Sequence, residues 1–121
     1  MPKRALLSAF ALGAGLGATF APAAAAQPPR PVHVTIRDHT FVPSVVHVKP
    51  GQAVVWRNED QDPHTVTSGG HNVDDGRFVS SPLIADGETF TLRLARPGTY
   101  PYFCKPHQFQ ESMHGTIVVA R

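Results

Sequence analysis

The residues with the clearest chemical potential lie in one short segment near the C-terminal end of the chain. This segment holds Cys104, the only cysteine, and His107 stands three positions after it. Met113, the only methionine after the first residue, follows in the same segment. Soft sulfur ligands together with imidazole are a donor set that copper favours. We therefore interpret the segment as a loop that binds one copper ion.

Other interpretations of these residues fit less well. A free cysteine is often a small buried hydrophobe and a methionine often fills a core, but the C-x-x-H spacing lets Cys104 and His107 reach one ion. Structural zinc sites favour two to four thiolates. A nucleophilic Cys–His pair gives Met113 no role, and the sequence offers no evident oxyanion arrangement. We therefore expect a metal-binding protein and not an enzyme.

A remote histidine is a further candidate for the same site. His64 stands where a polar loop meets a predicted strand, directly after Pro63 and 104 − 64 = 40 positions before Cys104. By itself, a histidine at such a junction fits a surface or capping role. A trigonal site of two histidines and one cysteine with a weak axial methionine, however, is typical of electron-transfer copper centres. The chain contains every member of that set.

The rest of the chain has the pattern of short strands that could position these loops. Alternating apolar residues and clusters of β-branched and aromatic residues predict strands. These strands cover residues 32–36, 45–48, 53–56, 65–67, 89–94, 99–103 and 115–119. Turn signals such as Pro50-Gly51 and Pro97-Gly98 separate them, and Phe41 is a predicted core anchor. Short strands at this spacing, without a useful helical pattern, predict an all-β sandwich or barrel.

Residues 1–26 have the pattern of a secretory signal peptide. Lys3 and Arg4 precede an uncharged apolar run, which ends in small residues of the A-x-A type. Three glycines interrupt this run, which is short beside the roughly 20 apolar residues that a membrane span needs. We expect cleavage after Ala26, no membrane span in the remaining chain, and a periplasmic or otherwise exported location.

The remaining residues, 27–121, are expected to form one domain. They number 121 − 26 = 95, enough for one small hydrophobic core. Without Lys3 and Arg4, the 11 basic residues become 9 and balance the 9 acidic ones. A near-neutral domain gives no support for nucleic-acid binding. Its single cysteine cannot form an internal disulfide, which leaves an intermolecular bridge, a reactive thiol or a metal ligand.

An ordered series of motifs resembles one protein family. The motifs are Phe41-x-Pro43, Val48-x-Pro50-Gly51, Val55-Trp56-x-Asn58, Pro63-His64-Thr65-Val66, Pro97-Gly98-Thr99-Tyr100, Phe103-Cys104-x-x-His107 and Met113-x-Gly115-x-Ile117-x-Val119. The series is similar to the cupredoxins of the small plastocyanin, pseudoazurin and amicyanin type, over nearly all of residues 27–121. The resemblance implies a Greek-key β-sandwich with one copper ion at one end. It assigns the copper ligands to His64, Cys104, His107 and Met113.

Two features depart from the family pattern. Five residues separate His107 from Met113, whereas the plastocyanin pattern has four and the amicyanin pattern two. The longer loop brings other donors near the axial position, namely Gln108, Gln110, Glu111 and His114. Thr65 stands where plastocyanin and pseudoazurin have asparagine. Its hydroxyl is a candidate link between the two ligand loops.

The resemblance implies a single-electron carrier that meets its redox protein partners transiently. His107, between Pro106 and Phe109, is the expected solvent-edge ligand near which a partner docks. The alternative is a copper-binding or copper-delivery protein of the cell envelope without an electron-transfer role. We expect a monomer. The other histidines lie on outward strand positions or in turns and are not expected to form a second metal site: His33, His39, His47 and His71.

Overall fold

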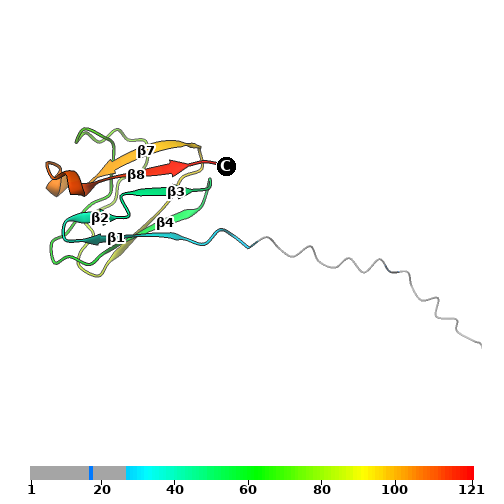
Figure 1. Ribbon diagram of the computed structural model, residues 1–121, viewed down its shortest axis with the longest axis horizontal. Coiled ribbons are helices and arrows are strands. Elements are labelled where there is room, and N and C mark those ends of the chain that lie inside the picture. The colour runs from blue at the N-terminus through cyan, green and yellow to red at the C-terminus, as the bar shows by residue number, and fades with distance from the viewer. Residues whose placement is uncertain (1–16, 18–26) are drawn as a thin grey trace, which may run out of the picture.

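The computed structural model describes residues 17 and 27–121, and residues 27–121 contain a β-sandwich of two four-stranded sheets (Figure 1). Apart from residue 17, the predicted signal peptide and its cleavage site lie outside the described residues. The strands are β1 (Val32–Arg37), β2 (Thr40–Val42), β3 (Val45–Val48), β4 (Ala53–Asn58), β5 (Thr67–Ser68), β6 (Thr89–Arg93), β7 (Gly98–Phe103) and β8 (His114–Val119). Two 3₁₀ helices, η1 (Lys105–His107) and η2 (Glu111–Met113), join β7 to β8. No helix in the described part of the chain is long and apolar enough to cross a membrane.

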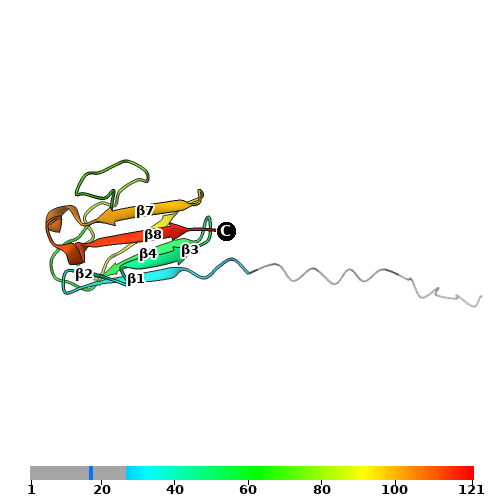
Figure 2. The same ribbon diagram turned by 45° about the horizontal axis from the view of Figure 1, so that its top comes forward.

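The two sheets have mixed strand directions. One sheet has the order β2-β1-β4-β6 and the other β3-β8-β7-β5. The β1–β4 and β3–β8 pairs are parallel, and the other pairs are antiparallel. Because chain neighbours such as β2 and β3 lie in different sheets, the chain crosses between the layers. This architecture confirms the predicted all-β Greek-key sandwich of seven to eight strands. Figures 1 and 2 show η1 and η2 at one end of it, opposite the C-terminus.

The core lies between the sheets and follows the alternation of the sequence. Along β1, Val34 and Ile36 are buried while His33 is exposed, because successive strand residues point to opposite faces. Phe41 is also buried, and its ring packs edge-on against Tyr102 with centroids 4.8 Å apart. The predicted core anchor is therefore confirmed.

The strand predictions differ from the structure in two places that matter for the site. Phe41 belongs to a short strand, β2, which follows a turn at Asp38 and His39. The predicted strand at residues 65–67 instead lies at Thr67–Ser68. The difference arises because the backbone of His64 forms an isolated β-bridge across the sandwich end, so the segment before β5 does not continue the ladder.

Candidate metal centre

The backbone of His64 is fixed from both sides. Its N–H donates to the carbonyl of Ile84 over 3.1 Å, and the N–H of Ile84 donates to the carbonyl of His64 over 2.7 Å. Asn58, buried at the end of β4, organises the preceding loop. Its side-chain amide donates to the carbonyls of Asp62 and Ile84, and its Oδ1 accepts the N–H of Asp60. These contacts hold the fully buried imidazole of His64 in one place.

Asp60 determines which nitrogen of His64 is free. The Asp60 carboxylate lies 2.8 Å from His64 Nε2 and also accepts the N–H groups of Asp38 and His39, over 2.7 and 2.9 Å. Burial by itself would raise the pKa of Asp60, but these hydrogen bonds lower the pKa on balance. Burial in turn lowers the pKa of His64, which favours the neutral imidazole. Because the carboxylate only accepts, Nε2 carries the proton and Nδ1 keeps a free lone pair.

The segment from Cys104 to Met113 is a series of linked turns. The N–H of His107 donates to the carbonyl of Cys104, that of Gln110 to His107, and that of Met113 to Gln110, over 3.0 to 3.1 Å. The N–H of Cys104 then donates to the carbonyl of Met113 over 3.0 Å, which closes the loop. The two 3₁₀ helices were not predicted, although the spacing of three in C-x-x-H-x-x-Q-x-x-M was visible. The turns accommodate five residues between His107 and Met113.

Three donor atoms of the predicted site converge at this end of the sandwich. Cys104 Sγ lies 3.6 Å from Nδ1 of His64 and 3.4 Å from Nδ1 of His107. A sulfur about 2.3 Å and a nitrogen about 2.0 Å from one tetrahedral ion lie about 3.5 Å apart. The separations therefore fit a single ion between the three atoms. Cys104 and His64 are buried, whereas His107 reaches the surface.

Thr65 joins the two ligand segments, as its sequence position led us to expect. Its hydroxyl accepts the N–H of Lys105 over 2.9 Å and lies 2.8 Å from the hydroxyl of Thr67. Its own N–H donates to Cys104 Sγ over 3.4 Å. Burial nevertheless raises the pKa of the Cys104 thiol. The thiolate form of Cys104 is thus favoured when a cation balances its charge. This property suits a metal ligand better than a free nucleophile.

Met113 is the one candidate for the axial position that is completely buried. The other residues that the sequence offers for the axial position have different surroundings. Gln110 and Glu111 are exposed, and Gln108 is half-buried. The Nε2 of His114 donates to the carbonyl of Gln108 over 2.9 Å. One thiolate and two imidazoles converge, and a buried thioether lies in the same loop; these are donor types that suit copper better than zinc.

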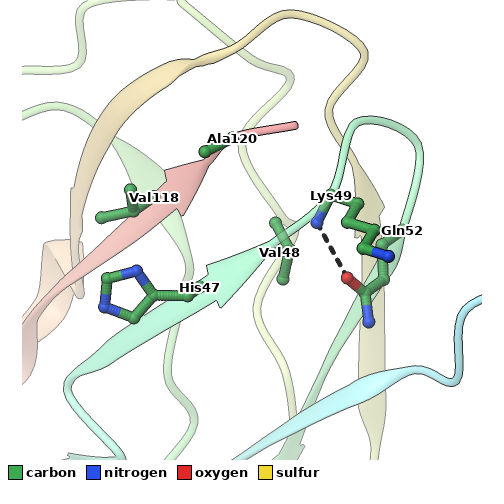
Figure 3. A pocket seen from close by; sticks show the side chains of 6 residues that line it. All are labelled: His47, Val48, Lys49, Gln52, Val118 and Ala120. Carbon is green, nitrogen blue, oxygen red and sulfur yellow. Dashed lines mark hydrogen bonds between the residues drawn. The ribbon is translucent and has the colours of Figure 1, made fainter.

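A separate hollow lies at the other end of the sandwich. It is a pocket of about 240 Å³ where β3 and β8 end (Figure 3). Its lining residues are His47, Val48, Lys49, Gln52, Val118 and Ala120. The N–H of Lys49 donates to the side-chain carbonyl of Gln52 over 2.8 Å across its rim. None of the predicted metal ligands lines this pocket.

Comparison with known proteins identifies the family. The model of the cupredoxin-like domain matches residues 8–119. Amicyanin-alpha of Methylorubrum extorquens is 34% identical over 116 residues, covering 95% of this chain and 93% of the relative. Plastocyanin of Scenedesmus fuscus is 37% identical over 84 residues, covering 65% of this chain and 85% of the relative. The chain belongs to the cupredoxin-like domain family.

The solved structures give the same result. A mutant amicyanin in the Cu(I) form superposes with a TM-score of 0.63 at 29% sequence identity. The match covers 74% of this chain and 81% of that structure. The resemblance that the sequence motifs indicated is therefore confirmed at the level of family and fold.

Proposed function

We propose that residues 27–121 bind one copper ion through His64, Cys104, His107 and Met113 and carry single electrons between redox proteins. The observation that carries this proposal is the convergence of the Cys104 sulfur with two imidazole Nδ1 atoms. The similarity to amicyanin and plastocyanin supports it. A bound copper ion supplies one-electron chemistry between Cu(II) and Cu(I).

The residues around the donors keep the site constant in shape. Asp60 fixes the ring of His64, and Thr65 links the two ligand segments. Donors held in this way move little when the charge of the site changes, which keeps the barrier to electron transfer low. The N–H of Thr65 also stabilises negative charge on the sulfur of Cys104.

His107 is the proposed route by which the electron enters and leaves. It is the partly exposed donor, and Pro106 beside it is exposed. Phe109, two positions further, is 87% exposed. An exposed apolar surface around a redox centre suits a small, transient interface with a partner protein. We propose that the carrier is a monomer and has no catalytic role.

Export also belongs to the proposal. Lys3, Arg4 and the apolar run before Ala26 support removal of residues 1–26 as a signal peptide, which leaves 27–121 as a periplasmic or otherwise exported domain.

Voltammetry of the copper-loaded protein, with a Cu(I) chelator present, tests the role. A carrier gives a reversible wave over repeated cycles. It also retains its copper ion after reduction to Cu(I). A copper-delivery protein instead loses its copper to the chelator on reduction, and this result would replace electron transfer with copper handling. Cys104→Ser is the control, because it lacks the thiolate that the wave requires.

A further inference from the structure

Three side chains next to the proposed copper centre form a second potential metal-binding cluster. One donor atom each from His39, Asp62 and His107 lies within 4.8 Å of the other two. His39 Nε2 is 2.9 Å from an oxygen of Asp62. We propose that these three residues form an outer site for a divalent transition-metal ion, which shares His107 with the buried centre and serves as the entry point for copper.

The backbone holds His39 in position for this role. Asp38 and His39 both have φ of 52°, the left-handed conformation that turns the chain sharply. The N–H of His39 donates to Asp60 over 2.9 Å, and Ser112 Oγ donates to the carbonyl of His39 over 2.6 Å. His39 is thus tied to both segments that supply the proposed copper ligands. Its ring packs edge-on against that of His107, with centroids 4.6 Å apart.

The chemistry of the cluster suits Cu(II) or Zn(II). Two imidazoles and one carboxylate are donors that both ions accept, and water can complete the coordination. The side chains of His39 and Asp62 are 36% and 59% exposed, so an ion reaches them directly from solvent. The cluster has no thiolate. The cluster should therefore bind Cu(II) more weakly than the proposed buried centre does. Weaker binding is necessary if copper is to move inward from an entry site.

Sharing His107 gives the ion a path inward, a step that rests on the proposed copper centre. An ion at the outer site can exchange His39 and Asp62 for His64 and Cys104 while one imidazole keeps it on the protein. The bonds to His39, Asp62 and a completing water break, and bonds to His64, Cys104 and Met113 form. The thiol of Cys104 gives its proton to water, and the oxidation state of the ion does not change.

Calorimetry on a variant without the inner thiolate tests the outer site with the inner centre weakened, and the effect of Asp62→Asn assigns the binding to the outer site. The full chain with Cys104→Ala is titrated with Zn(II), alone and with Asp62→Asn added. We expect binding of one ion, weakened about tenfold or more by Asp62→Asn. Asp86→Asn, which changes an exposed carboxylate outside the cluster, is the matched control and should leave the affinity unchanged. Absence of binding, or equal affinities with Asp62→Asn and Asp86→Asn, would overturn the outer site.

Stopped-flow loading of the chain with an intact Cys104 tests the entry role and does not depend on how Cys104→Ala folds. On mixing apoprotein with Cu(II), the thiolate charge-transfer band should grow about tenfold more slowly in Asp62→Asn than in the wild type, to the same final absorbance. His33→Gln, at an exposed histidine on β1, should load at the wild-type rate. Equal rates for Asp62→Asn and the wild type would refute the entry role. A band that never forms, even in the wild type, would contradict the copper centre itself.

Discussion

Replacing Asp60 with asparagine should weaken the fold and the copper site together. The carboxylate accepts hydrogen bonds from His64 Nε2 and from the backbone N–H groups of Asp38 and His39. Asparagine has one oxygen to accept with, and its NH₂ group would face a donor. The buried ring of His64 would then lose the partner that fixes its orientation.

The size of the effect follows from the surroundings of these contacts. A hydrogen bond to a charged group contributes about 1.5–3 kcal/mol. The contact with Asp38 is exposed and water can replace it, whereas the ring of His64 is fully buried. We therefore expect the free energy of unfolding of the apoprotein to fall by about 2–4 kcal/mol. Copper affinity should fall by about 10- to 100-fold.

Urea unfolding of the apoprotein, followed by fluorescence, measures the first effect. Trp56 is the only tryptophan and is fully buried, so its emission reports global unfolding. With a slope of about 1–3 kcal/mol per molar urea, the midpoint of Asp60→Asn should fall by about 1–2 M. The control is Asp86→Asn, at an exposed carboxylate. If both variants unfold at the wild-type midpoint, the structural role given to Asp60 is wrong.

The same contacts predict a pH dependence. The pKa of Asp60 is lowered in the folded state, so the unfolded chain binds its proton more readily. The stabilisation is then complete above the unfolded pKa of about 3.9 and is lost as pH falls below it. The stability difference between the wild type and Asp60→Asn should be largest near neutral pH and should shrink below about pH 4. A difference that grew in acid would contradict this account.

Further substitutions test other contacts. Thr65→Val removes the hydroxyl that links the ligand segments, so the free energy of unfolding should fall by about 1–3 kcal/mol in thermal denaturation; an unchanged melting temperature would argue against that link. Gly115→Ala makes a Cβ overlap with the ring of Tyr102 and should cost about 1–3 kcal/mol or more. Gly70→Ala, whose Cβ would meet its nearest neighbour at 3.6 Å, is the control and should be nearly neutral. Met113→Gln should lower the reduction potential with copper still bound; no shift would show that another residue is the axial ligand.

Local patterns were sufficient to predict most of the sandwich. Strands with one buried face show period-two alternation, as Val34 and Ile36 do in β1, and this signal requires no knowledge of the fold. The two-residue strand β5 and the three-residue strand β2 are too short to leave such a signal. β2 forms by pairing with the end of β1, and β5 forms by pairing with β7, where Thr67 lies opposite Phe103, 103 − 67 = 36 positions later.

The site was only partly predictable, because some of its contacts join residues that are distant in sequence. The spacing of Cys104 and His107 is local, so their proximity could be inferred from sequence. Asp60 and His39 were missed because their contacts join segments about 20 residues apart, and a left-handed histidine has no clear sequence signal. The one local hint was that Asp60 precedes His64 by four positions within the same loop.

The most direct test of the central claim is the visible absorption and electron-spin-resonance spectrum of the purified protein after addition of one equivalent of Cu(II). We predict an intense thiolate-to-copper charge-transfer band that is absent from Cys104→Ser. A colourless complex, or a band that survives in Cys104→Ser, would contradict the proposal that Cys104, with His64 and His107, forms the copper centre.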